Sequence, residues 1–266
     1  MPFFDTHTHL DYLAQDLNQS LSQLVAEANA QRVEKMLVVG INRQSIDFLP
    51  TWLSGQPNLY YGVGLHPLFI ATHQRQDLDY LEQHLAQQNN QCIAVAEIGL
   101  DRYPADIITE QMWQKQCEFF DAQLSLANRY HLPVNLHSRR AHDQLYTFLK
   151  RHQLPKTGIV HGFSGSYEQA KRFVDLGYKI GVGGTITYPR ANKTRQAIAR
   201  LPLSALVLET DSPDMPIMGW QGQPNHPARL PLIFAELCQL RSENQENIAE
   251  QLWQSSVQLL LSEKQS

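Results

Sequence analysis

The sequence predicts an α/β fold, a single-domain (β/α)8 barrel of the TIM type over residues 1–266. Three observations predict it. Short apolar runs rich in β-branched and aromatic residues recur eight times, amphipathic stretches separate them, and eight such units fit the usual length of this barrel. An open doubly wound sheet is the competing architecture. Neither Gly62-Val63-Gly64 nor Gly181-Val182-Gly183 continues to the third glycine of a dinucleotide-binding fingerprint, which argues against it.

The eight apolar runs are the expected strands. They are Phe3–His7, Lys35–Gly40, Leu59–Gly64, Ile93–Glu97, Val134–His137, Gly158–His161, Tyr178–Val182 and Ala205–Glu209. Their starts lie about 20 to 40 residues apart, which leaves room for helical connections. The clearest amphipathic stretches are Leu17–Gln31, Leu78–Gln87, Gln111–Tyr130, Tyr167–Leu176 and Ile233–Leu261. No linker, repeat or low-complexity segment divides the sequence, so one domain is expected.

The composition is that of a protein with a large core. Hydrophobic residues make up 42% of the chain and charged residues 18%. No apolar run approaches the roughly 18 residues that a membrane span needs, so we expect no membrane association. Met1-Pro2-Phe3-Phe4-Asp5 lacks the features of a signal peptide, and we expect a cytoplasmic protein. The three cysteines, Cys92, Cys117 and Cys238, are expected to be buried and reduced.

Charge is distributed unevenly along the chain. Residues 129–200 contain 13 lysines and arginines against three acidic residues, a net charge of +10, within a chain of net charge −4. Such a segment can form a basic patch that attracts a polyanion, or it can be solvated helix surface. The sequence leaves both interpretations open.

Polar residues that can bind metal lie at the C-terminal ends of the expected strands. His7 and His9 end the first strand, Glu97 the fourth, His137 the fifth and His161 the sixth, and Asp211 follows the eighth. That end of a (β/α)8 barrel carries the active site, so these side chains are expected to converge. His7 and His9 are two residues apart and therefore lie on one face of a strand. Four imidazoles and two carboxylates suit zinc, manganese, cobalt or nickel better than calcium.

Six motifs carry a resemblance to a known family. They are Asp5-Thr6-His7-Thr8-His9, Gly64-Leu65-His66-Pro67, Ala96-Glu97-Ile98-Gly99-Leu100-Asp101, Leu136-His137-Ser138-Arg139, Val160-His161-Gly162-Phe163-Ser164-Gly165 and Leu208-Glu209-Thr210-Asp211-Ser212-Pro213. In this order the sequence resembles the TatD-type metal-dependent deoxyribonucleases of the amidohydrolase superfamily. The resemblance implies two divalent metal ions per chain, zinc or, for activity, magnesium or manganese. One ion would be held by His7, His9 and Asp211 and the other by His137 and His161, with Glu97 between them.

The expected reaction is the hydrolysis of a phosphodiester, with DNA as the implied substrate and no obligate protein partner. Paired divalent metals can generate hydroxide near neutral pH and hold phosphate oxygens. Asp211 and Glu97 are the expected catalytic residues, Asp211 as the proton acceptor. The alternative is a metal-dependent ester or amide hydrolase, such as an aminoacyl-tRNA deacylase. Many binuclear amidohydrolases bridge their metals with a carboxylated lysine, so a glutamate at position 97 favours the phosphodiester.

Substrate contacts are expected from His66, Arg139 and Asn225. A structural salt bridge is the alternative for Arg139. The turn of residues 162–166 can either bind a phosphate through backbone N–H groups or simply connect strand and helix. Asn225 lies in the loop of residues 221–227, which lacks two basic residues common in the family that the sequence resembles. The aromatic side chains expected in the loops at the barrel mouth, which could stack on bases or close the mouth, are Tyr103, Tyr188 and Trp220.

Overall fold

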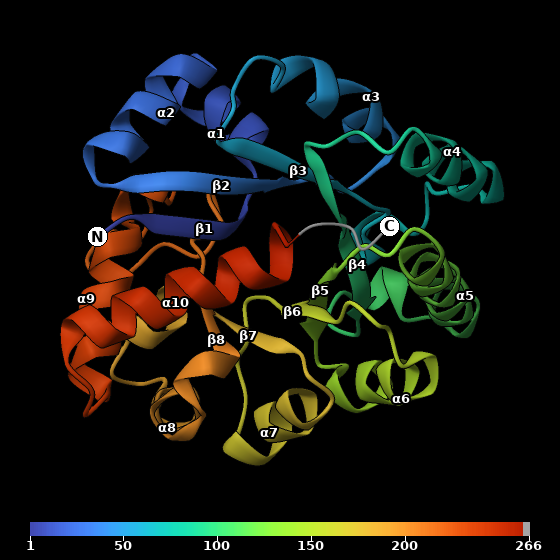
Figure 1. The fold of residues 1–266 in the computed structure, drawn as a ribbon. Helices are drawn as coiled ribbons and strands as arrows, with labels where there is room; N and C mark the ends of the chain where they lie inside the picture. The colour runs from blue at the N-terminus through green and yellow to red at the C-terminus, as the bar shows by residue number, and fades with distance from the viewer. Residues whose placement is uncertain (263–266) are drawn as a thin grey trace.

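A computed structural model describes residues 1–262 and contains one parallel sheet of eight strands in the order β1 to β8. The strands form a ring with the helices outside it (Figure 1), which confirms the predicted (β/α)8 barrel. The strand bounds are β1 Phe3–Thr8, β2 Val33–Val39, β3 Leu59–Val63, β4 Cys92–Asp101, β5 Val134–Arg139, β6 Gly158–Val160, β7 Lys179–Val182 and β8 Leu206–Leu208.

Helices connect successive strands and follow the last one. The α-helices are α1 Leu10–Leu17, α2 Leu21–Ala30, α3 Arg43–Trp52, α4 Arg75–Ala86, α5 Glu110–Arg129, α6 His142–His152, α7 Tyr167–Asp175, α8 Asn192–Arg200, α9 Leu230–Leu240 and α10 Gln245–Leu260. Short 3-10 turns are η1 Pro67–Phe69, η2 Ala105–Ile107, η3 Gly184–Thr187, η4 Leu203–Ala205 and η5 Pro227–Arg229.

A capping residue changes the bounds of two predicted helices, so that one begins later and the other is two helices. The expected helix over residues 17–31 begins instead after Ser20, whose hydroxyl accepts the N–H of Gln23, and α1 precedes it. The expected helix over residues 233–261 is two helices, because the side chain of Asn244 accepts the N–H of Asn247 and starts α10. β4 also continues four residues beyond its predicted end at Glu97.

The strands alternate between two apolar cores. In β2, Leu37 and Val39 pack inside the barrel, whereas Met36 and Val38 pack in the layer between strands and helices. Helix α10 crosses one end of the ring of strands (Figure 1) and brings Leu260 against the interior cluster. The opposite end, where the strands terminate, carries the polar residues.

No strand pairing connects β8 to β1 in the described part of the chain. Individual hydrogen bonds join the two ends of the sheet instead. The hydroxyl of Thr6 donates to the carbonyl of Leu208 at 2.9 Å, and the N–H of Asp211 donates to the carbonyl of His7 at 2.9 Å. The N–H of His9 donates to the carbonyl of Ser212 at 2.7 Å. These bonds close the barrel and fix Asp211 beside the two histidines.

Among residues 1–262, no helix is both long and apolar enough to cross a membrane. None of the three cysteines forms a disulfide. Cys92 is buried as expected, but Cys117 and Cys238 are only half-buried, because they lie on the edges of α5 and α9 rather than in a strand.

Replacing Thr6 by valine removes the hydroxyl that joins β1 to β8 and leaves a buried carbonyl without its donor. We expect Thr6→Val to lower the free energy of unfolding by about 1 to 3 kcal/mol, measured by urea denaturation in the presence of a chelator. The control is Thr147→Val on α6, whose exposed hydroxyl also donates to a backbone carbonyl. Equal urea midpoints for the two variants would contradict a role of Thr6 in closing the barrel.

Candidate metal centre

The structure brings all six predicted metal-binding side chains together at the C-terminal ends of the strands. Three overlapping sets have ligand atoms within 4.8 Å of one another: His7, His9 and Asp211; His7, Glu97 and His161; and His66, Glu97 and His137. The cluster takes residues from the three strands β1, β4 and β5, and from the segments that follow β1, β3, β6 and β8. Their assignment as metal ligands stays a prediction, but the convergence that it requires is present.

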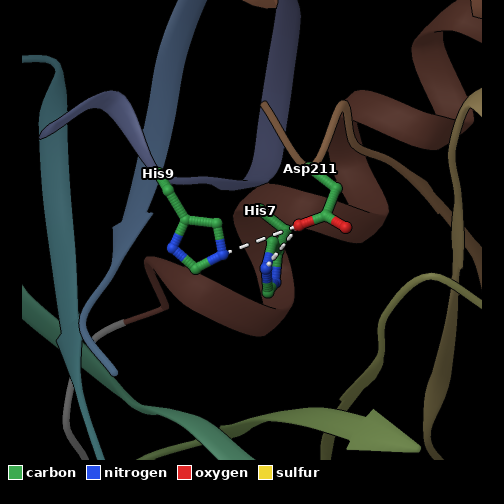
Figure 2. Close-up of side chains that lie close together, drawn as sticks. All are labelled: His7, His9 and Asp211. Atoms are coloured by element: carbon green, nitrogen blue, oxygen red, sulfur yellow. Dashed lines mark ion pairs between the residues drawn. The ribbon is translucent and has the colours of Figure 1, made fainter. Parts of the chain in front are cut away.

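The first set comes from β1 and the segment after β8 (Figure 2). The Nε2 atoms of His7 and His9 lie 3.2 and 3.6 Å from Oδ1 of Asp211. Asp211 has a φ of 58°, the left-handed region, which aspartate tolerates better than most residues. Its backbone bond to His7 holds this conformation, so the carboxylate points at the two imidazoles.

Glu97 lies at the centre of the cluster and uses both carboxylate oxygens. Oε1 lies 2.7 Å from Nε2 of His161 and 3.2 Å from Nδ1 of His137. Oε2 lies 3.5 Å from Nε2 of both His7 and His9. The two oxygens of one carboxylate therefore contact different imidazoles, as those of a bridging ligand do.

Hydrogen bonds outside the cluster determine which imidazole nitrogen faces Glu97. Nδ1 of His7 donates to Oδ1 of Asn135 at 2.9 Å, and Nδ1 of His9 donates to the carbonyl of Val39 at 3.1 Å. Nε2 of His137 donates to Oδ2 of Asp101 at 2.9 Å. In the neutral ring the other nitrogen then has no proton and presents a lone pair to the centre. Metal-binding histidines are oriented in this way.

When these rings are neutral, their lone pairs face carboxylate oxygens, which also carry lone pairs. In the chain alone the neighbouring carboxylates raise the pKa of His7 and His137 despite burial, so protons lie between the atoms. Nε2 of His7 is completely buried and has no hydrogen-bond partner in the described chain. Such an arrangement is repulsive unless protons or cations lie between the atoms. The donor set, four imidazole nitrogens and two carboxylates, fits divalent transition metals. The residues present therefore fit the expected metal ions.

His66 differs from His7, His9 and His137, whose outer nitrogens donate to protein acceptors; Nδ1 of His161 has no hydrogen-bond partner in the described chain. Its Nδ1 accepts the backbone N–H of Leu68 at 3.1 Å, so the proton of the neutral ring is on Nε2. That Nε2 lies 3.0 Å from Oε1 of Glu97 and donates to it. Burial lowers the pKa of His66 to about 4, so the ring is neutral at physiological pH. His66 is thus a hydrogen-bond donor to Glu97 rather than a metal ligand in this geometry.

Charge within the cluster controls the ionisation of its carboxylates. Burial alone would raise the pKa of Glu97, but the surrounding imidazoles hold it well below its usual range. The pKa of Asp211 is lowered in the same way against the effect of burial, chiefly by His7. Both carboxylates are ionised at neutral pH and can balance cationic charge. Glu209 behaves differently, since burial raises its pKa to about 8.

Sequence reasoning missed the residues that support the ligands. Asn135 and Asp101 orient His7 and His137. Asp5 accepts hydrogen bonds from the N–H and hydroxyl of Thr210, next to Asp211. A polar residue within a buried strand is the available signal, because it needs a hydrogen-bond partner inside the barrel.

The predicted substrate-contact residues have different surroundings. Arg139 is exposed beside the cluster, forms no salt bridge in the described chain and lies with its guanidinium 3.6 Å from the centre of the Tyr103 ring. Asn225 is buried, and its amide donates to the carbonyls of Thr210 and Met215 and accepts the N–H of His226. Its amide is fully engaged in holding the loop after β8, so the geometry does not support the expected substrate contact.

The turn after β6 uses its backbone N–H groups internally. Gly162 donates to Glu209, Gly165 to the hydroxyl of Thr194, and Ser166 to the side chain of Gln169. The interpretation as a strand-to-helix turn is therefore favoured over a backbone phosphate site.

Of the three aromatic residues in the loops, Tyr188 donates to the carbonyl of Pro216 at 2.6 Å and so closes part of the mouth. Tyr103 and Trp220 remain exposed, and each lies beside an arginine: Arg139 for Tyr103 and Arg229 for Trp220.

Comparison with known proteins gives a consistent result. Residues 4–261 match the family described as TatD related DNase. The chain is 58% identical to an uncharacterised metal-dependent hydrolase of Haemophilus influenzae, over 97% of this chain and 99% of that protein. It is 28% identical to a fission yeast protein named deoxyribonuclease Tat-D, over 89% and 86% of the two chains. The crystal structure of YjjV, a TatD homologue of Escherichia coli K12, superposes with a TM-score of 0.93 at 46% identity, covering 98% of each chain.

Replacing Glu97 by glutamine keeps the shape of the side chain and removes its charge and one acceptor oxygen. We expect Glu97→Gln to reduce bound zinc from two ions to one or none per chain, measured by elemental analysis after gel filtration. The barrel should stay folded, because residues at this end of the strands are not part of its apolar core. Glu118→Gln, at an exposed position on α5, is the control. Two tightly held ions in the Glu97 variant would show that this carboxylate does not bridge them.

Proposed function

The chain belongs to the TatD related DNase family, and on that premise we propose that it is a two-metal hydrolase that cleaves phosphodiester bonds in DNA. The observation that carries the proposal is the carboxylate of Glu97, which faces separate groups of imidazoles with its two oxygens. Two cations that share one carboxylate can hold both the attacking and the leaving oxygen of a phosphodiester.

We assign the ligands by the nitrogens that face the centre. His7, His9 and Asp211 would hold one ion together with Oε2 of Glu97, and His137 and His161 would hold the other with Oε1. When bound, divalent ions lower the pKa of water and offset negative charge on phosphate oxygens. Zinc is the proposed resident ion, with magnesium or manganese able to support activity.

Asp211 is the proposed proton acceptor. Its carboxylate is ionised at neutral pH, because the histidines hold its pKa low despite burial. Its side chain is 12% exposed, whereas that of Glu97 is 3% exposed. Asp211 is therefore the carboxylate that both faces the cluster and is open to water. Glu97 stays in place through its contacts with five histidines and sets the spacing of the two halves.

His66 and Arg139 are the proposed groups that contact substrate or orient the site. Nε2–H of His66 donates a hydrogen bond to Oε1 of Glu97 and so helps to orient that carboxylate. Arg139 has a planar guanidinium that can bind two phosphate oxygens at once. Since no carboxylate within 4.0 Å pairs with Arg139 in the described chain, a substrate phosphate has no competitor there.

DNA is the proposed substrate for two reasons. A relative of this chain bears the name deoxyribonuclease Tat-D, and exposed cations lie beside the cluster. An ester or amide hydrolase is the competing function. Its binuclear members commonly bridge their metals with a carboxylated lysine, and here the side chain at the centre of the cluster is the carboxylate of Glu97.

The proposed function is tested by offering metal-loaded protein four substrates in parallel. They are end-labelled single-stranded DNA, end-labelled double-stranded DNA, bis-p-nitrophenyl phosphate and a D-aminoacyl-tRNA. We expect cleavage of the phosphodiesters, loss of that activity with a chelator, and no release of the amino acid. Deacylation of the tRNA without phosphodiester cleavage would instead assign the ester hydrolase function.

Asp211→Asn tests the proton acceptor. Asparagine is nearly the same size but cannot accept the proton from water, so we expect kcat to fall by more than about tenfold, equivalent to about 1.4 kcal/mol. The assay is bis-p-nitrophenyl phosphate hydrolysis at saturating metal, with Asp175→Asn on the exposed face of α7 as the control. A kcat/KM within about tenfold of the wild-type value would require another base.

A further inference from the structure

A pocket of about 420 Å³ lies on the same end of the barrel as the metal centre, where α6, α7 and α8 begin. Residues from the segments after β5, β6 and β7 line it, among them Arg140, Ser164, Arg190 and Lys193. Arg140 is three residues beyond His137, and Ser164 is three residues beyond His161. The pocket therefore adjoins the half of the cluster that these two histidines form.

Three cations around this pocket have no anionic partner. Arg140, Arg190 and Lys193 are exposed, and none of them forms a salt bridge within residues 1–262. The basic segment of residues 129–200 contains many other cations that do pair. The paired cations are Arg129 with Glu82, Arg151 with Asp121, Lys171 with Asp175, Arg172 with Asp143, and Arg195 with Glu236. Three of the cations of the segment that form no salt bridge in the described chain therefore lie together at the pocket.

The backbone adds positive potential at the same place. Helices α6 and α8 begin after Ala141 and Ala191, and neither N-terminus has a side-chain cap. Their first N–H groups and helix dipoles favour an anion. Asp143 in the first turn of α6 is paired with Arg172 and does not neutralise the pocket cations. Ser164 adds a hydroxyl to the lining, within 3.5 Å of the hydroxyl of Thr194.

We propose that this pocket binds a backbone phosphate of a polynucleotide strand whose scissile bond lies at the metal centre. This inference rests on the proposed function and specifies its substrate as a strand of several nucleotides rather than a small phosphodiester. The cations are long exposed side chains from separate loops along one edge of the barrel, an arrangement that follows an extended chain of phosphates. Tyr103 lies beside Arg140 of the pocket, with Arg139 and Arg140 over its ring at 3.6 and 4.6 Å, and offers a surface for a base.

The test measures the binding of fluorescein-labelled octathymidylate and dithymidylate by anisotropy at two salt concentrations. Metal-loaded protein carrying Asp211→Asn is the parent, so that turnover does not consume the strands. Lys193→Gln and Arg190→Gln are added separately to this parent. Lys150→Gln is the matched control, because Lys150 is an exposed lysine of the same basic segment, on α6, without a salt bridge in the described chain.

We expect Lys193→Gln and Arg190→Gln each to weaken octathymidylate binding by about three- to tenfold. Each should also reduce the slope of log affinity against log salt by about 0.7. Dithymidylate binding should change less than twofold, because its single phosphodiester would lie at the metal centre and leave no second phosphate for the pocket. Lys150→Gln should match the parent with both strands.

Three results would overturn the inference. One is equal octathymidylate affinity in all variants, and another is no measurable octathymidylate binding by the parent. The third is that submillimolar inorganic phosphate displaces the strand from the parent but does not displace it from the variants. This result would identify free phosphate as the ligand of the pocket. None of these results depends on catalysis. Failure of the pocket is therefore separable from failure of the proposed function, which is judged by the four-substrate assay.

Discussion

The side chain of Glu97 is 3% exposed, yet its pKa is held well below the usual range. An isolated carboxylate would not remain ionised at such a position, because burial favours its neutral form. Five imidazoles within 3.5 Å compensate for the lost water. The position of each imidazole is fixed in turn by its own strand, so the ionised state of one carboxylate depends on the whole barrel being closed.

Barrel closure and site assembly are therefore the same event. The bonds that join β8 to β1 include the N–H of Asp211 donating to His7 and the N–H of His9 donating to Ser212. Two neighbouring residues of β1 add further bonds: Thr6 donates to the carbonyl of Leu208, and Asp5 accepts the N–H of Thr210. Polar groups occupy positions that apolar residues fill in the other strands. The barrel thus contains a polar sector beneath the site, held together by these hydrogen bonds.

The outer surface follows a different electrostatic pattern. Several cations on the outer helix faces of the basic segment pair with nearby carboxylates, whereas Arg140, Arg190 and Lys193 around the pocket form no salt bridge within residues 1–262. Pairing cancels long-range potential, so these three unpaired cations add positive potential beside the mouth. An anionic substrate would be attracted to the mouth beside Glu97 rather than to the rest of the surface.

The sequence by itself determined the fold class and the six candidate ligands. Eight apolar runs at regular spacing permit few other folds, and the ends of parallel strands meet at one edge of the barrel, so polar residues at those ends must converge. The sequence could not determine the imidazole tautomers, because these depend on Asn135, Val39 and Asp101 from other strands. Nor could it separate His66 from the other histidines, since a single backbone N–H, that of Leu68, decides which of its nitrogens carries the proton. Which cations of residues 129–200 form salt bridges likewise depended on carboxylates elsewhere in the sequence, such as Glu82 and Glu236. The local sequence pattern determines on which element and at which end a side chain lies. Only tertiary contacts determine which atoms that side chain faces.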